Sequence, residues 1–272
     1  MIDADYLSKK FAIIGINKGD VLFIHSAFSA VGPVEGGVET FLDALCMAVG
    51  EEGTVIFPTF TDGGTPFSVK DSVANTGVLS ETFRHRKSAV RSLHPTHSAA
   101  AIGRQAEYFT GSEWVTDTTC GEGTIYMKLA NSDAKQMMLG VDLNRCTMLH
   151  CSEDAAVVDY LLPEVKIAPP VERPDITAVR KYPPGHRAFI HLMKALRDKP
   201  WFTQMYIGEA KMLVYPIKEM HDYCMEELKA DPYLFLCENP SCNSCMYIRK
   251  NEFLGGKTCA ASRCEVCRFD EY

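Results

Sequence analysis

The sequence lacks the features that mark membrane, secreted and nucleic-acid-binding proteins. No run of about 18 apolar residues occurs, so we expect no membrane-spanning helix. The first residues, Met1–Asp5, are acidic and contain no apolar stretch, which is not typical of a secretory signal. The chain has no basic run and a formal net charge of −7, which argues against a nucleic-acid partner. These absences predict a cytoplasmic protein that binds neither membrane nor nucleic acid.

Two common nucleotide-binding motifs are also absent. The sequence contains neither the G-x-G-x-x-G spacing nor a Gly-Lys-Ser or Gly-Lys-Thr triplet, which excludes a Rossmann fingerprint and a P-loop. A different glycine-containing loop, Ser26–Gly37, follows an apolar run and carries the hydroxyls of Ser26 and Ser29. Glycines before a helix start let backbone N–H groups approach an anion. They are equally typical of a plain turn, so the loop alone favours neither interpretation.

The hydrophobic pattern predicts an α/β fold. With 272 residues, 46% of them hydrophobic, the chain can bury a substantial core. Apolar runs of strand length occupy Val21–His25 and Thr54–Phe57, and apolar residues recur at helical spacing between Val38 and Val49. A strand, a crossover helix and a second strand form a βαβ unit, so we expect the two strands to be parallel.

Further elements are expected along the rest of the chain. A strand is expected at Gln136–Val141, followed by a helix from Thr147 to about Tyr160. Other helices are expected at Asp3–Ile14, at His186–Arg197 and after Pro216. The proline-rich segment 165–184 is expected to be loop or edge structure. A boundary near Asp231 and Pro232 separates a domain over residues 1–232 from a cysteine-rich tail over residues 233–272.

The segment Arg91–Ser98 combines a fixed positive charge, hydroxyls and two imidazoles within eight residues. Arginine binds phosphate through a fork of N–H donors, and histidine moves protons near neutral pH. His94 and His97 offer too few ligands for a metal site, so hydrogen bonding or positioning is the expected role of one or both. The segment therefore predicts an anionic ligand beside acid–base chemistry.

The segment Thr147–Glu153 adds a histidine and a carboxylate at helical spacing. His150 and Glu153 are three residues apart, so a helix places their side chains next to each other. A carboxylate beside an imidazole holds its tautomer and favours its action as a general base, and Asp154 is a second candidate for that carboxylate. Cys151 is not expected to be a nucleophile, because adjacent helical residues point about 100° apart. The pair follows an expected buried strand, where ligands usually bind in α/β sheets.

Taken together, these motifs resemble those of the aminoglycoside 3-N-acetyltransferase family, whose members use acetyl-CoA. The stretches that carry the resemblance are Val21–Gly37, Gly53–Thr61, Gly77–Arg84, Arg91–Gly103 and Leu139–Glu153. The combination of R-S-x-H-P-x-H-S with T-x-L-H-x-x-E is specific, and both motifs stand in the order that the family has. The likeness fades beyond Tyr160.

The resemblance implies helices packed around a central mixed sheet, and direct acetyl transfer to an amine in a ternary complex. It implies that acetyl-CoA binds along the serine-glycine loop and beside the arginine motif, through Ser26, Phe28, Ser29, Gly32, Arg91 and Ser92. His150 matches the general base of the family and Glu153 its orienting carboxylate, and His97 is expected to line the same site.

The chemistry of the implied reaction agrees with these residue types. An acceptor amine with a pKa of about 10.4 is mostly protonated at neutral pH, so a base must remove a proton before or during attack on the thioester. The developing oxyanion needs a hydrogen-bond donor, for which a backbone N–H or the Thr147 hydroxyl is a candidate. The expected catalytic set is therefore His150, Glu153, His97 and Thr147.

The acceptor is not fixed by these motifs. We expect a polar, cationic small-molecule amine such as an aminoglycoside, but the region after Glu153 lacks the acidic stretch by which typical family members hold one. Two alternatives therefore stay open: a family-like enzyme that acetylates a different amine, and a non-catalytic scaffold that binds CoA or a protein partner. The oligomeric state is also open, and a homo-oligomer is compatible with the sequence.

Six of the 11 cysteines lie between Cys237 and Cys267, where two C-x-x-C pairs occur. In a cytosolic protein such spacing favours a metal site over disulfides, and the expected zinc ligands are Cys242, Cys245, Cys264 and Cys267. Cys237 and Cys259 are left over and could form a disulfide or extend the site. An iron–sulfur cluster is the alternative, because C-x4-C-x2-C is also a ferredoxin spacing. A structural metal knuckle away from the acetyl transfer is the expected role.

Overall fold

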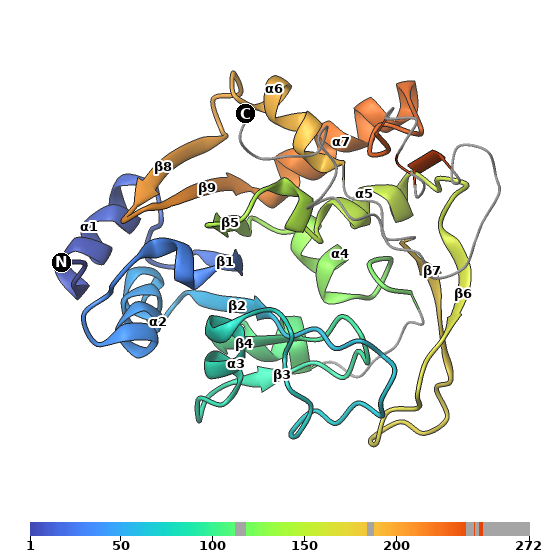
Figure 1. Cartoon of the computed structure of the whole chain (residues 1–272), viewed down its shortest axis with the longest axis horizontal. Coiled ribbons are helices and arrows are strands. Elements are labelled where there is room, and N and C mark those ends of the chain that lie inside the picture. Colours follow the sequence, from blue (N-terminus) through green and yellow to red (C-terminus); the bar gives the residue numbers. More distant parts are fainter. Residues whose placement is uncertain (112–117, 184–187, 238–241, 243–244, 247–272) are drawn as a thin grey trace.

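A computed structural model of the chain describes residues 1–111, 118–183, 188–237, 242 and 245–246. Its centre is a seven-stranded mixed sheet in the order β3-β4-β2-β1-β5-β9-β8. The bounds of these strands are β1 Val21–Ser26, β2 Thr54–Pro58, β3 Val90–Arg91, β4 Ala99–Gly103, β5 Lys135–Leu139, β8 Thr203–Ile207 and β9 Ala210–Pro216. The expected α/β fold with helices around a mixed sheet is confirmed (Figure 1).

The parallel strands form the middle of the sheet. Strand β1 pairs in parallel with β2 on one side and with β5 on the other. Strands β4 and β9 pair antiparallel to the outer edges of this trio, and β3 and β8 complete the two margins. The parallel βαβ unit predicted from residues 21–57 is therefore confirmed, and it lies at the centre of the sheet, where every residue of its two strands except Ser26 is buried.

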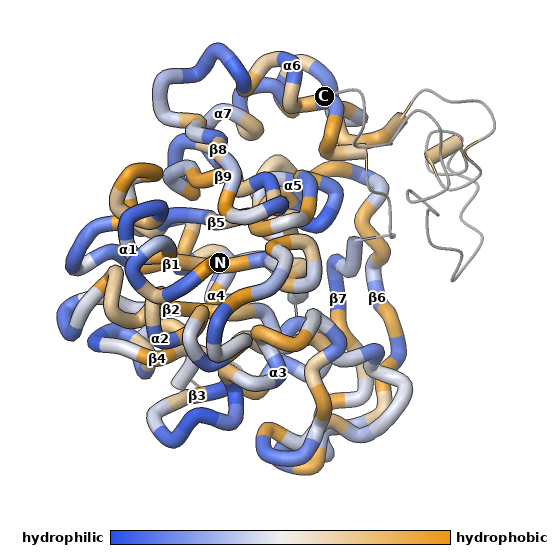
Figure 2. The backbone as a smooth tube through the Cα atoms, turned by 60° about the vertical axis from the view of Figure 1, so that its left-hand side comes forward, coloured by the Kyte–Doolittle hydropathy of each residue, from blue (hydrophilic) through white to orange (hydrophobic). Residues whose placement is uncertain are grey.

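Helices cover both faces of the sheet, because successive side chains of a strand point to opposite faces. Val21 and Phe23 of β1 pack in one hydrophobic cluster, and Leu22 and Ile24 pack in the other. The second cluster is shared with α1 Ala4–Ile13, α2 Gly37–Val49 and α3 Val78–Arg84, and the first with α4 Ile125–Ala130, α5 Leu149–Ala155, α6 Met193–Leu196 and α7 Ile217–Ala230. Figure 2 shows hydrophilic segments along the outer margin beside α1 and α2, and hydrophobic segments at β1 and β2 further in.

Local signals set several of the boundaries. The carboxylate of Asp3 caps α1 by accepting a hydrogen bond from the Tyr6 backbone N–H, and Gly50 ends α2 at a φ of 69°. Pro216 precedes α7, as expected from the sequence. The helices that the sequence predicted around α1, α2 and α7 are confirmed within one or two residues.

Two expected helices are shorter than predicted. Helix α5 ends at Ala155 rather than near Tyr160, because Val157 adopts a left-handed φ of 54° that interrupts the helical hydrogen-bond ladder. The helix expected at His186–Arg197 is a 3₁₀ turn, Phe189–Leu192, followed by the short α6, and residues 184–187 lie outside the described part of the chain.

The proline-rich segment forms edge structure, as expected. Strands β6 Leu162–Lys166 and β7 Ala178–Tyr182 form a separate antiparallel pair. Figure 1 shows this pair on the far side of the molecule from α1, beyond α5. Among the described residues, none of the helices combines the length and apolar character that crossing a bilayer requires.

Candidate active site

A pocket of about 680 Å³ lies where the three parallel strands end. Ser26 ends β1, Pro58 ends β2 and Val141 follows β5, and all three line the pocket. Parallel strands bring their carboxyl ends to one edge of the sheet, which is where α/β folds usually bind ligands. The predicted position of the site is therefore consistent with the fold.

His150 and Glu153 form an ion-pair geometry at the wall of this pocket. The Nδ1 atom of His150 lies 2.6 Å from Oε2 of Glu153, whose side chain is completely buried. The second carboxylate oxygen, Oε1, accepts a hydrogen bond of 2.7 Å from the Tyr160 hydroxyl. The alternative partner, Asp154, instead lies 3.1 Å from the Lys181 amine. Both oxygens of Glu153 are thus engaged, which fixes the imidazole of His150 in orientation.

His97 lines the same pocket. Its Nδ1 atom lies 2.8 Å from the Thr96 hydroxyl, and its ring packs against Phe60 with centroids 4.7 Å apart. Burial lowers the pKa of His97 well below 6.5, and the positive charge that His94 and His150 can carry lowers it further. His97 is therefore a neutral ring, and it lies close enough to His150 for a positive charge on His150 to lower its pKa.

His94 holds the loop that presents His97. Its Nδ1 atom accepts hydrogen bonds from the backbone N–H groups of His97, at 2.9 Å, and Thr96, at 3.3 Å. Its Nε2 atom lies 3.2 Å from the carbonyl oxygen of Thr118, so it carries the proton. Burial lowers the pKa of His94 to about 4. The positioning role expected for this residue agrees with its contacts.

His25 of β1, which was not predicted as a site residue, also lines the pocket. Its Nδ1 atom lies 3.1 Å from the amide nitrogen of Gln136, and its Nε2 atom lies 3.2 Å from the Thr147 hydroxyl. Burial lowers the pKa of His25 to about 3, so the ring is neutral. The only available signal was a polar residue at the end of an otherwise apolar strand.

Thr147 lines the pocket between His25 and His150. Because an amide N–H of Gln136 is the donor to Nδ1 of His25, the proton of this neutral ring resides on Nε2. Nε2 then donates to the Thr147 hydroxyl oxygen. The Thr147 backbone N–H also lies 3.5 Å from Nε2, but it forms no hydrogen bond there, because a protonated ring nitrogen cannot accept one. The hydroxyl hydrogen of Thr147 is thus available to a ligand.

The residues expected to bind the cofactor divide into two groups. Ser26, Phe28 and Ser29 line the pocket, the last two on a 3₁₀ turn over Phe28–Val31. Gly32 ends that turn with a φ of 87° and is not part of the pocket wall. The structure therefore brings the front of the serine-glycine loop to His150 and His97, and turns the chain away at Gly32.

Arg91 and Ser92 also lie outside the pocket wall. The Arg91 guanidinium donates hydrogen bonds to the hydroxyls of Thr59 and Ser98 and to the carbonyl oxygens of Thr59, Val69 and Ser72. The Ser92 hydroxyl accepts from the Ala99 backbone N–H at 3.0 Å. Both residues are buried, and the Arg91 N–H groups that the sequence offered for phosphate donate within the fold instead.

The cysteines expected to carry chemistry or metal differ in placement. Cys151 is fully buried, and burial raises its pKa well above 9.0, which agrees with its rejection as a nucleophile. Cys242 and Cys245 lie together, and Cys237, which was left over in the predicted ligand set, is their neighbour. The other predicted ligands, Cys264 and Cys267, and also Cys259, fall outside the described residues.

Known proteins share this fold. A histidine mutant of aminoglycoside acetyltransferase AAC(3)-IVa in complex with gentamicin superposes with a TM-score of 0.82 at 26% identity, over 92% of this chain and 97% of that protein. The acetyltransferase AAC-IIIb in its binary complex with CoASH superposes with a TM-score of 0.74 at 25% identity, over 84% of this chain and 96% of that protein.

Sequence comparison gives the same family. Aminoglycoside N(3)-acetyltransferase VII of Streptomyces paromomycinus is 31% identical over 186 residues, which are 58% of this chain and 64% of the relative. The chain therefore spans less than two thirds of the length of the curated relatives that it matches. The family profile described as aminoglycoside 3-N-acetyltransferase matches residues 23–229, most of the chain. On that match, together with the superposed structures, this chain belongs to the aminoglycoside 3-N-acetyltransferase family.

Proposed function

We propose that this protein transfers the acetyl group of acetyl-CoA to an amine of an aminoglycoside, with His150 as the general base. The observation that carries the proposal is the contact of 2.6 Å between His150 Nδ1 and the buried carboxylate of Glu153 at the pocket wall. A carboxylate in that position stabilises the positive charge that the ring gains when it accepts a proton. The pair supplies what deprotonation of an ammonium-prone nucleophile needs.

The reaction is a direct displacement. The acceptor nitrogen attacks the carbonyl carbon of the thioester, a proton passes from that nitrogen to Nε2 of His150, and the carbon–sulfur bond breaks. The departing thiolate of CoA then takes the proton, so the imidazole returns to its neutral form. Glu153 keeps Nδ1 protonated throughout, which leaves Nε2 as the nitrogen that exchanges the proton.

Thr147 is the proposed donor to the developing oxyanion. Its oxygen is held by Nε2 of His25, so its own hydrogen can point to the carbonyl oxygen of the thioester. A donor that is fixed before the reaction stabilises the transition state more than one that must reorganise. His25, with its pKa lowered to about 3 by burial, stays neutral and keeps this arrangement over the working pH range.

The pantetheine arm of CoA is proposed to lie along the turn that carries Ser26, Phe28 and Ser29, because these residues form the pocket wall beside Thr147 and His150. The solved relative AAC-IIIb in complex with CoASH supports the choice of cofactor. For Arg91 and Ser92 we propose a structural role, because their side chains form hydrogen bonds within the fold around β3 and β4.

A second candidate function is acetylation of a less cationic amine. Within the described part of the pocket wall the charged side chain is Arg145, and no carboxylate lines the wall there. Carboxylates at that surface would raise the affinity for a polycationic aminoglycoside, whereas a neutral or singly charged amine can bind without them. This lining favours an amine with few positive charges, and the acetyl-transfer chemistry is the same for either acceptor.

The test is release of free thiol from acetyl-CoA with a panel of amines, followed by mass spectrometry of the products. The panel holds aminoglycosides, monoamines, amino sugars with one amine, and lysine peptides. Acetylated aminoglycoside with the highest kcat/KM supports the first candidate, and a higher kcat/KM for a monoamine supports the second. Saturable CoA binding without any acetylated product would overturn both and favour a non-catalytic scaffold.

A further inference from the structure

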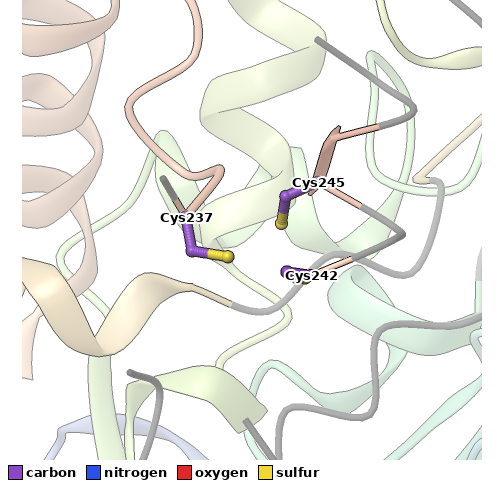
Figure 3. Close-up of side chains that lie close together, drawn as sticks. All are labelled: Cys237, Cys242 and Cys245. Carbon is purple, nitrogen blue, oxygen red and sulfur yellow. The ribbon is translucent and has the colours of Figure 1, made fainter. Parts of the chain in front are cut away.

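Three cysteines lie close together in the hydrophobic cluster that also contains the buried hydrophobic residues of α5. The sulfur atoms of Cys237, Cys242 and Cys245 all lie within 4.8 Å of one another, and all three residues are buried. Figure 3 shows Cys237, which follows α7, beside Cys242 and Cys245 from a later piece of chain, with the sulfurs of Cys237 and Cys245 directed toward the space between the three side chains. Side chains so placed can share one ion.

The spacing of the three residues suits a thiophilic metal. Cys242 and Cys245 form a C-x-x-C pair, and the backbone N–H of Met246 donates to the Cys242 carbonyl at 3.0 Å. Tetrahedral zinc with bonds of about 2.3 Å to sulfur separates its ligands by about 3.8 Å. A shift on the order of 1 Å closes the observed triangle onto such an ion.

We propose that Cys237, Cys242 and Cys245 bind one Zn²⁺ ion as thiolates. Cys237 replaces one of the later cysteines in the ligand set expected from the paired C-x-x-C spacing, because the chain folds back after α7 and buries it beside the other two. The role is structural, since the three sulfurs are buried and are not part of the pocket wall.

The zinc ion would hold residues 233–237 in place, and these residues pack behind His150 and Glu153. Phe235 packs edge-to-face on Phe189 with centroids 4.9 Å apart, and Phe189 packs on the ring of His150 at 5.2 Å. Tyr233 stacks on Tyr160 at 6.0 Å, and the hydroxyl of Tyr160 donates to Glu153. Residues 233–235 thus support both His150 and Glu153, and Cys237 anchors them two residues later. This consequence rests on the proposed function, whereas the metal site does not.

The test of the site is metal content with coordination spectroscopy. Protein produced in zinc-supplemented medium and purified without chelator is expected to carry equimolar zinc by elemental analysis. X-ray absorption is expected to show a sulfur shell at about 2.3 Å with at least three sulfurs. Protein without zinc that also takes up none on titration overturns the proposal. So does iron with acid-labile sulfide, or a disulfide among the three cysteines in freshly purified protein.

Variants identify the ligands. Cys237→Ala, Cys242→Ala and Cys245→Ala are each expected to lose the equimolar zinc, whereas the matched control Cys224→Ala, a buried cysteine of α7 in the same cluster, keeps it. Cys237→Ala protein that keeps equimolar zinc with an unchanged number of sulfurs refutes this ligand set. Where a variant does not fold, the sulfur count of the parent protein decides, because two or fewer sulfurs exclude the site.

A separate measurement tests whether the zinc site, through residues 233–235, holds His150 and Glu153 in position. Removal of zinc by a chelator is expected to lower the melting temperature by about 5 °C or more, and to lower kcat while the KM for acetyl-CoA stays unchanged. Zinc-loaded and zinc-free protein with equal kcat would refute the support while leaving the metal site intact. Zinc-loaded protein without any acetyl transfer would instead count against the proposed function.

Discussion

The Oε2 atom of Glu153 lies 2.6 Å from Nδ1 of His150, one helical turn away, and the carboxylate is completely buried. A buried carboxylate is stable only where its oxygens are paired, and here the second oxygen accepts from Tyr160. The arrangement holds the proton of His150 on Nδ1, which leaves Nε2 as the proposed proton acceptor.

His150→Ala is expected to lower kcat by about 10²- to 10⁴-fold, because it removes the base that takes the amine proton. The affinity for CoA is expected to stay unchanged, since the thioester is bound by other parts of the pocket. Steady-state kinetics and calorimetric titration with CoA measure the two quantities. His85→Ala, which alters an exposed histidine of α3, serves as the control and should behave like the parent. Full activity in the His150 variant would refute the assignment of the base.

Glu153→Gln is expected to lower kcat by about 10²- to 10⁴-fold without changing the shape of the side chain. When the amide oxygen accepts from Tyr160, the amide N–H faces Nδ1 of His150, and the proton of the ring moves to Nε2. Nε2 then cannot accept a proton from the amine. The exposed Glu219→Gln on α7 is the matched control. A Glu153 variant with a kcat within about twofold of the parent would show that the tautomer is set by another group.

Thr147→Val is expected to lower kcat by about 10²-fold, because it removes the proposed oxyanion donor while it preserves the volume of the side chain. Thr147→Ser keeps the hydroxyl and is expected to retain most of the activity. The comparison is made at saturating acetyl-CoA, with KM measured for both substrates. If valine and serine at this position give the same kcat, the donor is a backbone N–H instead.

Acid is expected to destabilise the fold through the buried histidines. In the unfolded chain their imidazoles titrate near pH 6.5, whereas burial lowers the pKa of His25 to about 3 and of His94 to about 4. Between these values the unfolded state binds more protons, so the free energy of unfolding falls as pH falls. The slope reaches about 1.4 kcal/mol per pH unit for each such ring. Stability from these rings is complete above pH 6.5.

Urea denaturation at about pH 7.5 and about pH 5 measures this slope. His94→Asn keeps an acceptor near the position of Nδ1 and is expected to show a weaker dependence on pH than the parent. An identical pH dependence in the His94 variant and the parent would contradict the neutral, buried state of that ring.

Arg91→Met is expected to lower the free energy of unfolding by about 3 kcal/mol, because it removes the donor to the carbonyl oxygens of Val69 and Ser72 and one of the two donors to that of Thr59. CoA affinity of the folded variant is expected to match the parent. The exposed Arg104→Met is the control and should change neither quantity. A tenfold loss of CoA affinity without a loss of stability would instead support the phosphate contact that the sequence suggested.

Much of the fold could be predicted because it depends on local patterns. The buried strands at residues 21–26 and 54–58 read as continuous apolar runs, and α2 shows its helical period and its terminal glycine. The end of α5 could not be predicted in this way, because it depends on Val157 adopting a left-handed conformation that valine rarely takes. Local preference and tertiary packing disagree at that residue.

The candidate site was predictable where its residues stand close together in the sequence. His150 and Glu153 are one helical turn apart, so their contact follows from helix geometry. The contact of His25 with Thr147 joins two residues that are distant in the chain, and the pairing of β1 with β5 brings them together. The same holds for Arg91, which donates hydrogen bonds to Thr59 directly after β2, a residue distant from it in the sequence.

By itself, the sequence determined the three central strands, the helices around α1, α2 and α7, the family, and the histidine–carboxylate pair that lies on one helix. Tertiary structure decided which polar side chains face the pocket and which are used internally: Thr147 faces the pocket, whereas Arg91 is bonded within the fold. It also decided that Cys237 lies beside Cys242 and Cys245. The physical reason is that helical spacing fixes contacts over one turn, whereas contacts between distant segments depend on how the sheet and the helices pack.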